Sequence, residues 1–131
     1  MKLRIKGNSM RLRVSRSELA RLLNGERIED TIHFSAAATD SHLTYGLQFI
    51  AQTAPISVEW EPQSATVLLS EEQMTCWAME TQVGIYATVD LGLNGLLDVL
   101  VEKDFACLDR SDEENSDTFA NPESETSCSR A

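Results

Sequence analysis

The feature that most constrains the fold is a pattern of strands around a short helix that occurs twice, 55 residues apart. Ser15 precedes Glu18 by three residues, and Ser70 precedes Gln73 by the same spacing. A serine followed after three residues by Glu or Gln is the capping box that begins a helix. Apolar residues then follow at matching positions: Leu19, Leu22 and Leu23 in the first copy, and Met74, Trp77 and Ala78 in the second. The sequence therefore predicts two short helices in register.

Alternating apolar and polar residues predict two strands on either side of each helix, because a period of two is expected of a strand with one buried face. In the first copy the alternating apolar residues are Leu3, Ile5, Met10, Leu12, Val14, Ile28, Ile32, Phe34, Leu43, Tyr45, Leu47 and Phe49. In the second they are Ile56, Val58, Trp60, Ala65, Val67, Leu69, Val83, Ala87, Val89, Leu97, Val99 and Val101. The first strand after the helix aligns between the copies without a gap, which places Val83 under Ile28.

Two β-β-α-β-β units, residues 1–50 and 56–108, predict a single α+β domain over residues 1–108. A chain of 131 residues is long enough for one hydrophobic core and too short for two. One unit alone could not bury its apolar face, so we expect the two to close into a small β-barrel or sandwich. The repeated pattern also indicates an internal duplication. Trp60, Trp77 and Tyr45 lie on predicted core faces and are interpreted as packing residues.

Residues 109–131 differ in composition from the rest of the chain. They are rich in Asp, Glu and Ser, with Phe119 as their one aromatic residue. Such a segment buries too little apolar surface to fold by itself, so we expect a disordered acidic tail. A short motif within it is available to a protein partner, and its members are Asp117, Phe119, Asn121 and Pro122. The tail is also able to fold back onto basic residues of its own chain and compete with an anionic ligand.

The net charge of -10 limits the possible partners. An acidic protein repels nucleic acid on average, so a nucleic-acid role requires a local basic patch. No apolar run approaches the roughly 20 residues that span a bilayer, and the charged N-terminus lacks the apolar region of a signal peptide. The three cysteines, Cys76, Cys107 and Cys128, form no CxxC pair and are typical of reduced thiols. We therefore expect a cytoplasmic protein that does not enter a membrane.

The first hairpin is the strongest candidate site. Alternation places five cationic side chains on the face opposite its core residues, namely Lys2, Arg4, Lys6, Arg11 and Arg13. Like charges across paired strands are unfavourable, so the cluster favours contact with phosphates or an acidic partner, with Asn8 as a donor at the turn. Two alternatives remain open: an edge hairpin kept soluble by its charge, or one neutralised internally by Glu59, Glu61 or the tail.

Residues 4–14, with their Gly7-Asn8-Ser9 turn, precede a serine-capped helix and a strand near Ile28. This arrangement resembles the swapped-hairpin barrel of the AbrB/MazE/SpoVT group over about the first 34 residues. The resemblance implies a swapped-hairpin-like fold and a DNA-binding regulator or antitoxin, built here from one chain. The whole chain is also similar to an uncharacterised family of small bacterial proteins that share the segment at residues 101–105 and an acidic tail.

The second hairpin departs from the AbrB/MazE/SpoVT pattern. The repeat places Glu59 and Glu61 under Arg4 and Lys6, so one half of the predicted pseudo-dimer has the opposite charge. This inversion argues against symmetric DNA binding. A single chain that holds both halves is compatible with a monomer, whereas oppositely charged hairpins favour head-to-tail self-association.

Residues able to support metal or catalytic chemistry are few. His33 and His42 flank a loop, but two imidazoles do not complete a metal site. Cys107 and Cys128 would form a metal or redox pair only across the flexible tail. No nucleophile has an assignable base, and no phosphate-binding glycine loop, HExxH or GxSxG motif occurs. We predict no catalytic residue, metal or cofactor.

The sequence thus predicts a non-catalytic binding protein with a regulatory or assembly role. The basic hairpin and the acidic tail would meet a macromolecular partner, either a protein or nucleic acid. An AbrB/MazE-like DNA-binding regulator or antitoxin-like protein is the alternative, and a small enzyme of unknown type is the third hypothesis.

Overall fold

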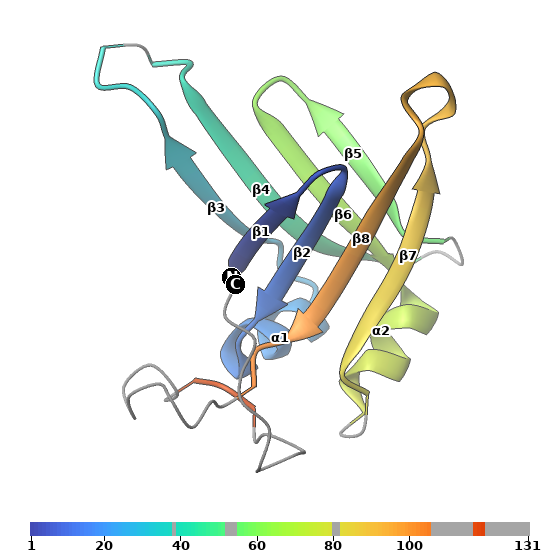
Figure 1. The fold of residues 1–131 in the computed structure, drawn as a ribbon. Helices are drawn as coiled ribbons and strands as arrows, with labels where there is room; N and C mark the ends of the chain where they lie inside the picture. The colour runs from blue at the N-terminus through green and yellow to red at the C-terminus, as the bar shows by residue number, and fades with distance from the viewer. Residues whose placement is uncertain (38, 52–54, 80–81, 106–116, 120–131) are drawn as a thin grey trace.

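The computed structural model describes residues 1–131 except 38, 52–54, 80–81, 106–116 and 120–131. The eight strands and two α-helices occur in the predicted order, and a short 3-10 helix that was not predicted precedes the last strand (Figure 1). They are β1 (Lys2–Lys6), β2 (Ser9–Val14), α1 (Arg16–Leu23), β3 (Ile28–His33), β4 (His42–Ile50), β5 (Ser57–Glu61), β6 (Ser64–Ser70), α2 (Glu71–Ala78), β7 (Gly84–Asp90), the 3-10 helix η1 (Gly92–Asn94) and β8 (Leu96–Lys103). Neither α-helix in this part of the chain has the length or apolarity to cross a membrane.

The strands form two four-stranded sheets, with orders β1-β2-β8-β7 and β3-β4-β6-β5. Each sheet joins a hairpin from the first half of the chain to one from the second, through the parallel pairs β2·β8 and β4·β6. No strand that the structure describes pairs with the opposite sheet, so the sheets make a sandwich and no closed barrel. Both helices lie at one end, and the tips of the β3–β4 and β7–β8 hairpins spread apart at the other (Figure 1).

The strand registers repeat between the halves. Leu12 of β2 pairs with Val101 of β8, and Val67, 55 residues after Leu12, pairs with Leu47 of β4. All four side chains are fully buried, two in each sheet. They belong to one core cluster with the buried helix residues Leu19, Leu22, Met74 and Trp77. The centre of the sandwich is therefore pseudo-symmetric in its pairing and in its packing.

Both predicted capping boxes are confirmed. The Ser15 hydroxyl accepts a hydrogen bond from the Glu18 amide, and the Glu18 carboxylate accepts one from the Ser15 amide at 2.9 Å. Ser70 and Gln73 make the same reciprocal pair at the start of α2. Each box satisfies backbone donors that a helix start leaves without an intrahelical acceptor. The two helices therefore begin where the local sequence predicts.

The gap-free alignment of the strand after each helix is wrong by two residues. In the first half of the chain, Ile28 pairs with Leu47 of β4. Val101 of β8 is the equivalent of Leu47 in the second half, and it pairs with Ile85. Val83 precedes β7 and is 38% exposed, whereas Ile85 is buried. A shift of two residues keeps every side chain on the same face of a strand, so alternation alone could not detect it.

The three aromatic residues interpreted as packing residues differ in their burial. Trp77 is fully buried, and Tyr45 is half-buried against the core. Trp60 is 65% exposed, although it pairs with Ala65 on the core-facing side of its sheet. Trp60 lies next to the β5–β6 turn, at the end of the sandwich away from the helices. The core therefore ends before it reaches that position.

Candidate functional site

The five cations of the first hairpin share one face of their sheet. Directly paired residues point to the same side, and β1 and β2 pair Lys2 with Arg13 and Arg4 with Arg11. Lys6 continues this row opposite Ser9. The core residue Leu12 points to the other side, so the cationic row lies on the outer face of the sheet.

Part of this basic row is neutralised within the chain. Lys2 Nζ lies 2.8 Å from Asp104 Oδ2, and Arg11 Nε lies 2.9 Å from Glu102 Oε1. These two carboxylates belong to the end of β8 and to the residue that follows it, and neither is Glu59 or Glu61. Arg13 also interacts within the chain. Among the described residues, Arg4 and Lys6 are the two cations of the row without an ion pair.

Glu102 also contacts the neighbouring strand. Tyr86 Oη donates a hydrogen bond to Glu102 Oε2 at 3.2 Å. Partial burial raises the pKa of Tyr86, and the negative charge of Glu102 raises it further. Tyr86 therefore stays a neutral donor at physiological pH, and Glu102 links the strand β7 to the cationic row through Arg11.

The turn donor Asn8 is engaged within the chain. Its side-chain Nδ2 donates to the Leu96 carbonyl at 2.7 Å, and its own carbonyl accepts from the Asp98 amide at 3.2 Å. The second half repeats the latter bond, because the Thr44 amide donates to the Gln63 carbonyl at 2.7 Å. Asn8 thus fixes the β1–β2 turn against the start of β8.

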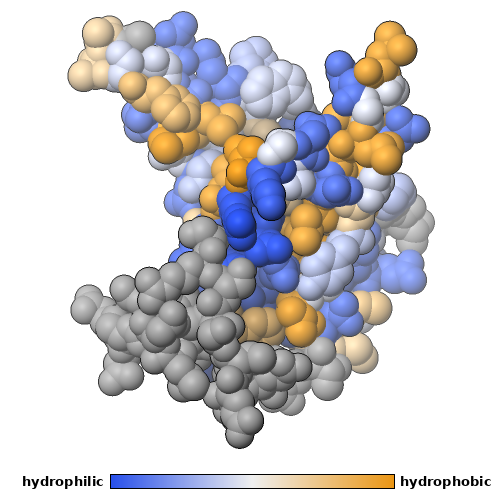
Figure 2. Space-filling view, viewed as in Figure 1, coloured by the Kyte–Doolittle hydropathy of each residue, from blue (hydrophilic) through white to orange (hydrophobic). Residues whose placement is uncertain are grey.

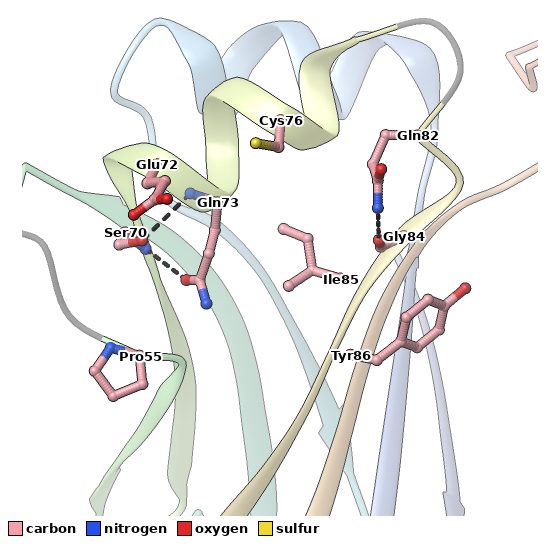
Figure 3. A pocket seen from close by; sticks show the side chains of 9 residues that line it. All are labelled: Pro55, Ser70, Glu72, Gln73, Cys76, Gln82, Gly84, Ile85 and Tyr86. Carbon is pink, nitrogen blue, oxygen red and sulfur yellow. Dashed lines mark hydrogen bonds between the residues drawn. The ribbon is translucent and has the colours of Figure 1, made fainter.

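A groove of 680 Å³ lies between α2 and β7 (Figure 3). Its polar groups serve the fold: Gln73 and Ser70 cap each other, and Gln82 Nε2 donates to the Gly84 carbonyl at 2.7 Å. Cys76 lines the groove, but no histidine, lysine or arginine does so among the described residues. A cysteine nucleophile needs such a group to favour its thiolate. The described lining of the groove therefore offers Cys76 no cationic or imidazole side chain that would favour its thiolate.

The histidines come together without completing a metal site. The rings of His33 and His42 lie with their centroids 5.7 Å apart on paired strands. His42 Nδ1 lies 3.2 Å from the Thr39 carbonyl. No group of three or more His, Cys, Asp or Glu side chains in the described ranges is placed to hold a metal. Cys107 and Cys128 fall outside those ranges.

Of the predicted tail, the structure describes residues 117–119, and these pack on the helix end of the domain. Asp117 Oδ1 accepts a hydrogen bond from the Ser17 amide at 3.1 Å, and Oδ2 accepts one from the Ser17 hydroxyl. The Arg16 amide donates to the Asp117 carbonyl at 3.2 Å. These bonds, that of the Ser17 hydroxyl above all, lower the pKa of Asp117. The predicted motif residues Asn121 and Pro122 lie outside the described residues.

Phe119 anchors the same segment. Its amide donates to the Asp104 carbonyl at 2.8 Å, and it forms a β-bridge with Phe105. The two phenyl rings meet edge to face with their centroids 6.1 Å apart, and Lys103 Nζ lies 5.3 Å from the Phe119 centroid. Three residues of the segment 101–105 thus form the docking site for residues 117–119. The composition of the tail alone could not show this, because the stabilising contacts come from β8 and the residues after it.

A second surface, which sequence reasoning missed, lies at the end of the sandwich opposite the helices. It contains large exposed apolar side chains, and we call this set the open-end patch: Ile5, Ile32, Phe34, Trp60, Leu91, Leu93 and Leu96. Ile5 pairs with Met10 and Ile32 pairs with Leu43, so both lie on core-facing sides of their sheets. Apolar surface is visible on both spread arms in Figure 2. Alternation assigns Ile5, Ile32, Phe34 and Trp60 to core faces, and the expectation that they are buried there is wrong, because all four are exposed.

The fold and these surfaces define a two-sheet β-sandwich with two capped helices and an apolar open end. A family model described as a family of unknown function (DUF7009) matches residues 1–123, and the chain belongs to this family. No curated protein and no solved structure matches the chain. The similarity to an uncharacterised family is thereby confirmed. None of the comparisons returns the AbrB/MazE/SpoVT group, and that resemblance stays a hypothesis.

Proposed function

We propose that this chain is a non-catalytic binding protein with an assembly or regulatory role, and that a protein partner docks on the open-end patch. The observation that carries the proposal is the exposure of Phe34 and Trp60, at 67% and 65%, in an apolar set spread over several strand ends. Large exposed apolar patches on soluble proteins mark interaction sites. Aromatic residues are enriched at the energetic centres of protein interfaces.

The surroundings of the patch support a protein partner. Arg4 and Lys6 flank Ile5 in β1 and make no ion pair within the described chain. These charges lie on the outer face of β1 and Ile5 lies on its inner face, so the cations border the open-end patch along the edge of the sheet. The residues of the tail motif that the structure describes, Asp117 and Phe119, contact the opposite end of the domain. We therefore assign partner binding to the open end and a structural role to residues 117–119.

We also propose that the two halves arose by duplication and form a swapped-hairpin-like arrangement within one chain. Two equivalent capping boxes and the equivalent pairs Leu12–Val101 and Val67–Leu47 support it. The three cysteines, spaced without a CxxC pair, support a cytoplasmic location.

Photo-crosslinking tests the binding surface. We expect p-benzoylphenylalanine at position 34 or 60 of the full chain to yield higher-mass protein adducts after irradiation of producing cells. The matched control is position 31, because Thr31 is exposed on the outer face of the same hairpin as Phe34. Adducts that form equally at position 31, or at none of the three positions, would contradict the proposal.

DNA binding is the second candidate, and the cations Arg4 and Lys6, which make no ion pair in the described chain, favour it. On this account duplex DNA binds at low salt, and affinity falls steeply as salt rises. The double substitution Arg4→Ala, Lys6→Ala then abolishes binding in a fluorescence-anisotropy titration. Arg21→Ala, which removes an exposed cation of α1, leaves it intact. A wild-type chain that fails to bind duplex DNA at low salt eliminates this candidate.

A further inference from the structure

We infer that the open-end patch binds a second copy of this chain, with the β1–β2 hairpin of one copy against the β5–β6 hairpin of the other. The inference rests on the proposed function, because it names the partner of that same surface. The observation behind it is that these two hairpins occupy equivalent places in the fold and have opposite charges.

The equivalence follows from the sheet topology. β1 is the edge strand beside β2 in one sheet, and β5 is the edge strand beside β6 in the other. Ile5 of β1 and Trp60 of β5 stand 55 residues apart, the spacing that relates the two halves in this region. Both side chains are on core-facing sides and both are more than half exposed, at 62% and 65%. Each hairpin therefore presents one large apolar side chain at the same relative position.

The charges beside these side chains have opposite sign. In β1 the flanking residues are Arg4 and Lys6, and in β5 they are Glu59 and Glu61. None of the four makes an ion pair with any residue that the structure describes. They belong to edge strands of different sheets, so each pair of charges lacks its complement within the described part of the molecule.

A second copy supplies the complement that each hairpin lacks. Its acidic β5 matches the basic β1 of the first copy, and the apolar side chains at the centres of the two strands are buried together. When the two edge strands pair, the apolar side chains meet on the inner faces and the unlike charges meet on the outer faces, so the charges set both the register and the choice of partner. Edge strands also keep backbone donors and acceptors on one side that a strand of another chain is able to pair. An anionic partner such as nucleic acid would match only the β1–β2 hairpin and would be repelled by the other.

Complementary charge reversal tests this pairing by sedimentation velocity on the full chain. We expect the wild-type chain to associate with rising concentration. The variant R4E/K6E has two acidic hairpins and the variant E59K/E61K has two basic ones, so each alone should sediment as a monomer at concentrations where the wild type associates. An equimolar mixture should recover the association, because every hairpin again meets its opposite.

Three features make the result interpretable. Each variant changes the net charge of -10 by four units, so both remain negative and do not attract each other as whole molecules. The substituted side chains lie on the outer faces of edge strands, where Lys6, Glu59 and Glu61 are exposed and Arg4 is partly exposed. A matching thermal unfolding curve verifies that each variant folds. The control R21E/R27E reverses the exposed charge of Arg21 and the half-buried charge of Arg27, both away from the edge strands β1 and β5, and it should associate like the wild type.

A wild-type chain that stays monomeric at all concentrations overturns the inference, and so does a mixture that fails to reassociate. Association that survives both reversals in the separate variants overturns it as well, because another surface then holds the copies together. Crosslinks from position 60 to a different protein, combined with a monomeric wild type, would refute self-pairing and leave the proposed function standing. A monomeric wild type that also gives no crosslink from position 34 or 60 would refute the two together.

Discussion

Replacement of Trp77 by alanine is expected to lower the free energy of unfolding by about 3–5 kcal/mol, because it removes the largest of the fully buried side chains. Trp77 belongs to the core cluster that both sheets share, and its indole N–H donates to the Val83 carbonyl at 3.3 Å. Truncation leaves a large cavity in the core and a lost hydrogen bond. Urea unfolding followed by circular dichroism measures the change.

Trp60→Ala is the matched control for this prediction. Trp60 is 65% exposed, so its replacement should change the free energy of unfolding by no more than about 0.5 kcal/mol. Equal losses in the two variants would show that Trp60 is part of the core, and would remove the exposed aromatic residue on which the open-end patch depends.

The second large effect is expected at the anchor of the tail. Phe119→Ala should lower the free energy of unfolding by about 1–2 kcal/mol, because the half-buried ring contacts Phe105 and lies over the Lys103 ammonium. Lys103 is itself buried and donates to the Met79 carbonyl at the end of α2, so the anchor and the second helix share a contact. Thermal unfolding measures the loss. Phe119→Leu should lose less than Phe119→Ala, and an unchanged midpoint in Phe119→Ala would contradict the docking.

The contact between Asp117 and Ser17 makes this docking depend on pH. The hydrogen bonds from Ser17 hold the pKa of the Asp117 carboxyl below its ordinary value of 3.8. A lowered folded-state pKa means that the contact stabilises the fold above the unfolded value and stops doing so as the pH falls through the folded value. The stability difference between the wild type and Asp117→Asn should therefore be present at neutral pH and disappear in acid. A constant difference across a pH series would contradict this assignment.

Local signals explain which parts of the fold the sequence could predict. Ser15 and Ser70 begin their helices through bonds that span three residues, so a short window of sequence contains the whole cause. Strand alternation correctly gives the inner and outer faces, as the buried residues Leu12 and Val67 show. The sequence could not show which strands pair with each other. The strands β2 and β8, for example, come from opposite ends of the domain sequence and pair in parallel.

Strand alternation could not predict that two of the aromatic side chains are exposed. Alternation tells on which face of a sheet Trp60 lies, but it carries no information on how far the opposite sheet extends. The hairpin tips spread beyond the core, so Phe34 and Trp60 have inner-face positions without a covering sheet. The ion pair of Lys2 with Asp104 joins residues that are far apart in the sequence, so neither the capping boxes nor the strand alternation could predict it.

We propose that the open end is exposed in the separate molecule and covered on association. Fluorine NMR of the chain labelled with 5-fluorotryptophan tests it most directly, because the two tryptophans give two signals that Trp60→Phe assigns. At low concentration the Trp60 signal should shift between H2O and D2O, as a solvent-exposed ring does, while the Trp77 signal should not. With rising concentration this solvent-induced shift of the Trp60 signal should decrease. A Trp60 signal insensitive to solvent at every concentration would contradict the account, because the ring would then be buried within its own chain.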